Sequence, residues 1–170
     1  MIEIASVSAG ADHDAARASL FSILDATPLC TIATCDAAAM PAAATAFYVV
    51  DHEDVVIYVL TGPDTVHGRN IRSSGRAALS VFSSTQEWTD AKRGVQLSAA
   101  AGLTKADDVE RVLELYLKSY PGLGKWVQSA GDIDKKLESR FFSFAVDRCK
   151  IFDEPNFGTE VWIEVEFARP

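Results

Sequence analysis

Apolar residues occur along this chain in short runs that have the period of β-strands. The run Val55–Leu60 is apolar throughout, which is typical of a strand buried on both faces. In Glu160–Phe167 apolar and polar residues alternate, which indicates a strand with one buried face. The other predicted strands are Leu29–Cys35, Ala42–Val50, Ala77–Phe82, Gly94–Ala101 and Phe141–Phe152.

Two segments have a helical pattern instead. Asp12 or Asp14 can cap a first helix, which the sequence Asp25–Pro28 ends. The clearest helix begins at Thr104–Asp107, which resembles a capping box, and its apolar stripe covers Val109–Tyr120. We therefore expect helices before the first long strand and after the predicted strand that ends at residue 101.

Two further regions are polar. Residues 1–10 are expected to form a loose tail, and Gly122–Ser139 a cover that is helical in part around Lys125–Ala130. Strands that lie mostly in antiparallel hairpins, with helices between some of them, predict an α+β protein. A doubly wound α/β fold is disfavoured, because strands and helices do not alternate regularly and no Gly-x-Gly-x-x-Gly turn is present.

Length and charge restrict the function classes. A chain of 170 residues, 48% hydrophobic, fits a single domain covering residues 1–170. The net charge of −8 argues against a nucleic-acid or anionic-membrane surface, which needs a basic face. No apolar run approaches the length of a membrane span, and no signal sequence follows Met1, so we expect a cytoplasmic protein.

The cysteines and histidines do not predict a metal site. Cys30 and Cys35 lie five residues apart in one predicted strand, so they point to opposite faces. Cys149 lies between Arg148 and Lys150, whose charges can lower its pKa, but a buried, unreactive thiol in a reducing compartment is the favoured interpretation. The three histidines are scattered along the chain and lack paired spacing. They are His13, His52 and His67.

The segment that follows Val55–Leu60 has the chemistry of an anion site. Gly62-Pro63 breaks the strand, and Asp64 or Thr65 can cap a new helix whose first turn offers free backbone N–H groups. Hydroxyl, imidazole and guanidinium groups surround this helix start: Thr61, Thr65, His67, Arg69 and Arg72. On these residues alone, a capped connector helix with solvated charges fits equally well.

The order of these elements resembles the flavin-binding split β-barrel family, whose best-known member is pyridoxamine 5′-phosphate oxidase. The family has a strand ending in Thr, then a Ser or Thr, then a Lys that opens a helix; here the same frame reads Thr61, Thr65 and His67. Ile71–Arg76 and the next strand follow, and Gln96 stands on the strand where the family has an Arg or Gln facing the flavin. The resemblance covers residues 20–167.

This resemblance implies a mostly antiparallel split β-barrel with peripheral helices that binds flavin mononucleotide (FMN) and acts as a flavin-dependent oxidoreductase. It also implies a homodimer in which the flavin lies between two subunits. Trp162 or its neighbours would then contact a ring bound mainly by the other subunit. The implied cofactor-binding residues are Thr45, Ala46, Thr61, Thr65, Val66, His67, Arg72, Gln96 and Trp162.

The chain departs from the family in three places. Ala42–Ala44 replace the arginine that the family uses to reach the phosphate, and His67 replaces the lysine. The C-terminal residues lack the chemistry with which pyridoxamine phosphate oxidases hold their substrate, so vitamin B6 metabolism is not predicted.

An alternative position for Trp162 does not involve a second subunit. Its side chain can pack under Gly122–Ser139 within the same chain.

Other functions remain open on the sequence. One is non-enzymatic binding of flavin, deazaflavin or haem. Another is a structural or stress-related dimer with an empty cleft.

Overall fold

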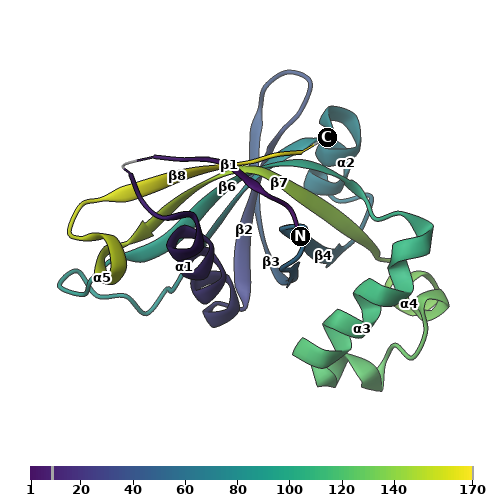
Figure 1. Ribbon diagram of the computed structural model, residues 1–170. Helices are drawn as coiled ribbons and strands as arrows, with labels where there is room; N and C mark the ends of the chain where they lie inside the picture. Colours follow the sequence, from purple (N-terminus) through teal and green to yellow (C-terminus); the bar gives the residue numbers. More distant parts are fainter. Residues whose placement is uncertain (9, 170) are drawn as a thin grey trace.

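Six antiparallel strands close into a β-barrel in the computed structural model, which describes residues 1–8 and 10–169 (Figure 1). Around the barrel the strands pair in the order β7-β4-β3-β2-β5-β6, and β6 pairs with β7 to close it. Their bounds are β2 Leu29–Cys35, β3 Pro41–Asp51, β4 Val56–Thr61, β5 Arg76–Phe82, β6 Arg93–Leu103 and β7 Arg140–Asp153. The predicted split β-barrel and α+β class are confirmed.

Two more strands extend the sheet beyond β7. β8 (Trp162–Phe167) pairs with β7, and β1 (Ile4–Val7) pairs with β8. Ile4 lies opposite Phe167, and Ile2 and Ile4 pack against the barrel core. The expectation of a loose tail over residues 1–10 was therefore wrong for residues 4–7, because a strand that pairs with a distant partner carries little local signal.

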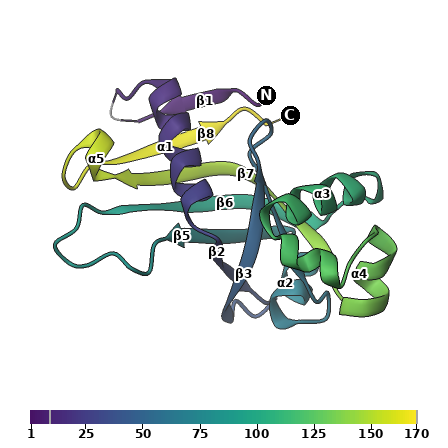
Figure 2. The same cartoon turned by 90° about the horizontal axis from the view of Figure 1, so that it is seen from below.

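The helices surround the barrel (Figures 1 and 2). α1 (His13–Ala26) begins at Asp12, whose carboxylate accepts hydrogen bonds from two backbone N–H groups, as predicted. α3 (Val109–Ser119) and α4 (Ala130–Leu137) lie together at one end, whereas α5 (Glu154–Phe157) and the loop between β5 and β6 extend at the other. α2 spans Val66–Ser74. None of the described helices is both long and apolar enough to cross a membrane.

Two helix starts differ from the sequence prediction. The predicted capping box at Thr104–Asp107 does not form, because Ala106–Asp108 make a 3₁₀ turn without a side-chain cap, and α3 starts only at Val109. The predicted helix at Lys125–Ala130 was also misplaced. Pro121 starts a 3₁₀ turn that ends at Lys125, and the helix follows at Ala130–Leu137.

Two apolar clusters hold the fold together. The larger fills the barrel and includes the fully buried Ile57, Phe142 and Phe144, with Leu20 of α1 and Ile71 of α2 packed against them. The smaller lies outside the barrel wall under α3 and α4, and comprises Val49, Tyr58, Val112, Leu113, Tyr116, Val127, Ile133 and Phe141. Burial of these side chains is the main stabilising contribution to the fold.

Within residues 1–8 and 10–169, the carboxylate of Asp153 is the charged group that is fully enclosed. Asp153, at the end of β7, is 0% exposed, and it accepts a hydrogen bond from Ser19 of α1. Arg93 of β6 binds the same carboxylate at 2.9 and 3.3 Å, and Asn156 of α5 binds it at 2.7 Å. Burial acts to raise the pKa of Asp153, but the hydrogen bonds from these three groups and the charge of Arg93 hold it below its ordinary value.

Candidate functional site

The turn between β4 and α2 is built around the hydroxyl of Thr65. As the N-cap of α2, this hydroxyl accepts the N–H of Gly68 at 3.1 Å and donates to the carbonyl oxygen of Gly62 at 2.8 Å. A Cβ on Gly68 would lie 2.7 Å from the Pro63 oxygen and 2.8 Å from the Gly62 oxygen. Only glycine therefore allows the turn to fold this closely onto the first turn of the helix.

His67 joins the two predicted threonines. Its Nε2 lies 2.8 Å from Oγ1 of Thr61 and 3.1 Å from Oγ1 of Thr65. Burial lowers the pKa of His67 below its ordinary value, so the imidazole is neutral at pH 7 before a ligand binds. The structure thus brings together the three residues of the predicted phosphate turn.

The helix start next to these side chains has free donors. Among the described residues, the backbone N–H groups of Val66 and His67 donate to no acceptor. Such groups at the N-terminus of a helix favour an anion. Val66 is 53% exposed and its side chain is apolar, so the group with which it can bind an anion is its backbone N–H.

Arg72 is at the turn but is paired with another residue. Its guanidinium lies 3.2 Å from the carboxylate of Asp64, and Arg69 donates to the Asp64 carbonyl oxygen. Asp64, the other residue predicted as a possible cap, is thus an exposed partner for Arg72. Because a guanidinium carries several N–H donors, the pairing with Asp64 leaves others that can contact a phosphate.

The barrel opens beside this turn, where β3 and β4 separate. Their pairing runs from Asp51–Val56 to Tyr48–Val59 and stops there. The hydroxyl of Tyr116 lies in the gap, where it accepts the N–H of Leu60 at 2.9 Å and lies 2.9 Å from the Phe47 oxygen. Tyr116 therefore satisfies backbone groups that a continuous ladder would have paired.

A cavity of about 590 Å³ occupies this opening. Thr45 and Ala46 of β3 line it together with Thr61, so three of the implied cofactor-binding residues meet at one place. Its remaining walls are largely aromatic and come from β3, β4 and the segment after α3: Phe47, Leu60, Tyr116, Tyr120, Gly122, Leu123 and Trp126. The aromatic walls from α3 and the residues after it were not predicted, although Tyr116 and Tyr120 share one face of the helical pattern.

Gln96 lies on the same outer face of the barrel wall as Thr45, but at a distance. Directly opposed residues connect them across the strands, from Thr45 through Thr31 and Ser80 to Gln96. Three strand spacings amount to about 14 Å. One chain therefore does not bring Gln96 to the cavity between β3 and β4.

Trp162 is farther around the barrel and was predicted either to reach a second subunit or to pack under Gly122–Ser139. In the structure it packs beside Phe152, with ring centroids 6.4 Å apart, and the ammonium of Lys150 lies 4.2 Å from the centre of its ring. Trp162 lines a cavity together with Gln96. The interpretation that Trp162 packs under the cover was wrong, because β8 extends from β7 away from α3 and α4.

The alanine-rich strand keeps the outer face of the barrel flat. In β3, Ala43 points outward, opposite Ala33 of β2, which in turn faces Ala78 of β5. No arginine replaces the missing family residue on this strand. The outer wall can therefore be approached closely by a flat ligand or by another protein surface.

The thiols take no part in this site. Burial raises the pKa of Cys149 to about 12, and that of Cys30 to about 12, so both are protonated at neutral pH. Cys149 is the buried thiol that the sequence favoured, because its side chain points into the barrel and not toward Arg148 and Lys150. Among the described residues, no cluster of His, Cys, Asp and Glu could hold a metal ion.

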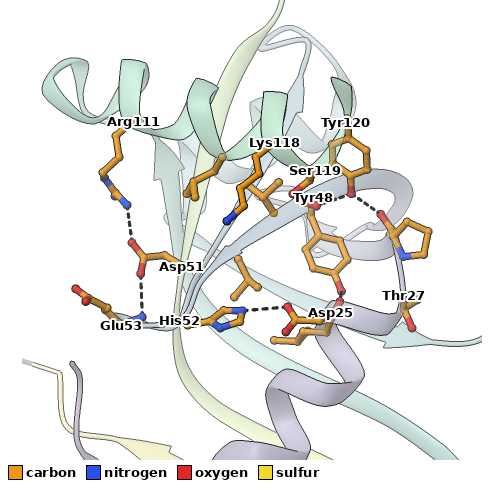
Figure 3. A pocket seen from close by; sticks show the side chains of 15 residues that line it. Asp25, Thr27, Tyr48, Asp51, His52, Glu53, Arg111, Lys118, Ser119 and Tyr120 are labelled. Carbon is orange, nitrogen blue, oxygen red and sulfur yellow. Dashed lines mark hydrogen bonds and ion pairs between the residues drawn. The ribbon is translucent and has the colours of Figure 1, made fainter. Parts of the chain in front are cut away.

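A second cavity, of about 750 Å³, lies between α1, β3 and α3 (Figure 3). Four of its polar side chains are paired: Arg111 binds Asp51 at 2.6 Å, and Nε2 of His52 lies 3.0 Å from the carboxylate of Asp25. Arg111 also donates to the hydroxyl of Tyr58 at 2.8 Å. These contacts fasten α3 and α1 to the turn after β3, and they join residues too far apart in sequence to be predicted.

The comparison with known proteins decides the family. The sequence pattern of pyridoxamine 5′-phosphate oxidase matches residues 17–167, nearly the whole chain. The chain belongs to the pyridoxamine 5′-phosphate oxidase family. No curated protein sequence matches this chain.

Solved structures with the same fold come from proteins of different kinds. A haem-binding protein from Mycobacterium smegmatis has a TM-score of 0.69 at 16% identity, over 92% of this chain and 59% of that one. The haem storage protein HutZ from Vibrio cholerae has a TM-score of 0.58 at 16% identity, over 75% and 87% of the two chains. General stress protein 26 from Bacillus anthracis has a TM-score of 0.59 at 12% identity, over 81% and 93%. At these identities the similarity shows the fold alone.

Proposed function

We propose that this member of the pyridoxamine 5′-phosphate oxidase family binds FMN and acts as a flavin-dependent oxidoreductase. The observation that carries the proposal is the convergence of Thr61, Thr65 and His67 at the start of α2, next to the cavity that Thr45 and Ala46 line. A bound flavin supplies reversible hydride or electron transfer, and the protein supplies its position and electrostatic surroundings. A cytoplasmic location is part of the proposal and is supported by three free cysteines.

The donor set of the turn fits a phosphate monoester. Two free N–H groups, two hydroxyls and an imidazole lie within one helical turn, and Gly68 keeps the backbone close to them. The Thr61 hydroxyl can turn from His67 to an incoming phosphate while His67 keeps its contact with Thr65, whose own hydroxyl stays bonded to Gly62 and Gly68. The flavin ring would lie against Thr45 and Ala46, between the aromatic walls.

Calorimetric titration with FMN and with riboflavin tests this assignment. We expect FMN to bind more tightly than riboflavin, because only FMN carries the phosphate that the turn is built to hold. Equal binding of the two flavins would show that the turn takes no part, and the absence of heat with both would remove the proposal.

FMN affinity is expected to increase as pH falls from about 8 to about 6. Burial lowers the pKa of free His67, whereas a phosphate dianion beside it favours the charged imidazolium and raises its pKa. Binding of FMN therefore takes up a proton. The increase in affinity is complete once the pH is below the pKa of His67 in the free protein. Dissociation constants measured across this range check the slope.

The His67→Ala variant is the control for that pH dependence. It retains the titration of the phosphate itself but loses the imidazolium, so its affinity at pH 6 is expected to be about tenfold weaker than that of the wild type. A variant with wild-type affinity and the same pH slope would show that His67 does not contact the phosphate.

The proposed site also needs a second copy of the chain. Gln96 and Trp162 lie on the outer wall far from the turn, so they can contact a flavin at the turn only if they come from a partner subunit. The outer face of the wall is apolar and flat enough to pair: Leu29, Ala33, Ala43, Phe47, Ala78 and Phe82. We therefore propose a twofold symmetric homodimer with two shared sites.

Light scattering at micromolar concentration is expected to give twice the chain mass. Replacing Phe47, which is 56% exposed, with glutamate is expected to give monomers, because it places a charge on the apolar face. A wild-type monomer that is saturated with FMN would contradict the shared site, whereas a dimer without FMN affinity would favour a structural role.

Haem or deazaflavin binding is the second candidate. A haem-binding protein and a haem storage protein share this fold, which favours haem over deazaflavin. In this chain, His52 is stacked on Phe21 at 4.2 Å and paired with Asp25, and His67 is held by two threonines. Use of His52 or His67 as a haem ligand would compete with these contacts, which favours FMN.

A further inference from the structure

The cavity between α1, β3 and α3 has walls that are fastened to one another (Figure 3). The hydroxyl of Tyr48 donates to the carbonyl oxygen of Leu24, near the end of α1, at 2.7 Å. The hydroxyl of Tyr120, directly after α3, lies 2.6 Å from the Tyr48 oxygen and 3.2 Å from the Pro28 oxygen. The walls are thus held in place before a ligand binds, and the volume of about 750 Å³ is typical of a small-molecule site.

One carboxylate of this cavity is saturated and another is not. Asp51 binds Arg111 through Oδ2, and its Oδ1 accepts two backbone N–H groups. His52 lies 3.0 Å from Oδ1 of Asp25, whereas Oδ2 of Asp25 accepts no hydrogen bond from the described residues. Glu53 adds a carboxylate that is in no ion pair within residues 1–8 and 10–169. The cavity therefore retains the capacity to bind a cation.

Lys118 supplies a free charge of the opposite sign. Its side chain extends from α3 into the cavity, on the other side of β3 from the end of α1 (Figure 3). In the part of the chain that the structure describes, no carboxylate lies within 4.0 Å of its ammonium. The α3 wall can therefore bind an anion, while the α1 wall, with Asp25, can bind a cation.

Aliphatic side chains line the space together with these charges. They are Leu24 of α1, Val50 of β3 and Leu115 of α3. A ligand with one charge alone would place that charge among groups of the same sign, because Lys118 opposes an amine and Asp25 and Glu53 oppose a carboxylate. A ligand that carries both charges, separated by a chain of methylene groups, meets a partner at each end and apolar surface between them.

We propose that this cavity binds a small aliphatic zwitterion. The carboxylate of the ligand accepts from the ammonium of Lys118, its ammonium donates to the free oxygen of Asp25, and its methylene chain packs on Leu24 and Leu115. This site does not depend on the flavin function proposed above. The cavity shares one lining residue, Tyr120, with the cavity assigned to the flavin.

Titration of the flavin-free protein with 6-aminohexanoate, followed by backbone amide NMR, tests the site. We expect the largest chemical-shift changes at the three walls, in residues 24–28, 48–53 and 111–120. Hexanoate and hexylamine, which each lack one charge, are expected to bind at least about tenfold more weakly. Shift changes confined to other parts of the chain, or equal affinity for all three compounds, would overturn the proposal.

Variants of the two charged residues assign each end of the ligand. Lys118→Gln is expected to weaken 6-aminohexanoate about tenfold without weakening hexylamine. Asp25→Asn, which keeps an oxygen for His52, is expected to weaken 6-aminohexanoate by a similar factor without weakening hexanoate. Lys105→Gln is the matched control, because Lys105 is exposed and lies outside the lining of this cavity. Equal effects of the Lys118 and Lys105 variants would contradict the assignment.

FMN separates this inference from the proposed function. We expect 6-aminohexanoate to bind equally to the FMN-free and FMN-loaded protein. Displacement of FMN by 6-aminohexanoate would place the zwitterion in the flavin cavity and overturn a separate site. Failure of FMN to bind, with zwitterion binding intact, would overturn only the flavin function.

Discussion

Replacing Asp153 with alanine is expected to lower the free energy of unfolding by about 3–5 kcal/mol. The carboxylate is 0% exposed and is the common acceptor for Arg93, Ser19 and Asn156, which come from three separate elements. Its loss leaves the Ser19 hydroxyl in the core without its acceptor and the Arg93 guanidinium without its counter-ion. Urea unfolding monitored by tryptophan fluorescence measures the change.

An exposed ion pair is the control for Asp153. Asp134→Ala removes the partner of Arg140, with side chains 61% and 43% exposed, and is expected to cost less than about 1 kcal/mol. A similar cost for both variants would show that the buried network contributes no more than a surface pair.

The pH dependence of this contribution follows from the lowered pKa of Asp153. Because the folded-state pKa lies below the ordinary value of the carboxyl, the stabilisation is fully present above about pH 4. It is lost as pH falls through the pKa of the folded state. The stability difference between the wild type and Asp153→Ala is therefore expected to shrink in acid.

Replacing Gly68 with alanine is expected to weaken FMN binding at least about tenfold, a change of about 1.4 kcal/mol or more. The added Cβ would lie 2.7 and 2.8 Å from two backbone oxygens, so the turn must move away from the start of α2. Overpacking of this kind costs about 1–3 kcal/mol, and here the displaced groups are those proposed to hold the phosphate. Calorimetric titration with FMN measures the loss.

Gly102→Ala is the matched control for Gly68. Its added Cβ would meet no atom within 4 Å, and its φ angle is not in the left-handed region. This variant is expected to bind FMN as the wild type does. Equal affinity in the Gly68 and Gly102 variants would place the phosphate away from the turn.

Local signals in the sequence were sufficient for the strands β2 to β8 and for the turn, but not for β1. The apolar run before Thr61, the Gly62-Pro63 break and the Thr65 cap act within a few residues of one another, so their geometry follows from short-range chemistry. The alternation in β8 likewise predicted its buried face. The split barrel itself required the resemblance to a family, because strand order is not a local property.

Contacts between distant segments were not predictable in the same way. The hydrogen bond from Leu60 to Tyr116, in the gap between β3 and β4, joins residues 56 apart in sequence. The bond from Arg111 to Asp51 joins residues 60 apart. The distance of Gln96 from the turn depends on the register of three strand pairs, which one residue of slip would change. Neither the hydrophobic period nor residue spacing contains that information.

The absorbance spectrum of the freshly purified protein, recorded before and after addition of FMN and gel filtration, tests the central claim most directly. We predict that the flavin absorption bands remain with the protein at one FMN per chain and shift from those of free FMN, as the ring enters the aromatic cavity lined by Thr45 and Thr61. Complete separation of FMN from the protein, or an intense Soret band from co-purified haem with no flavin retained, would contradict it.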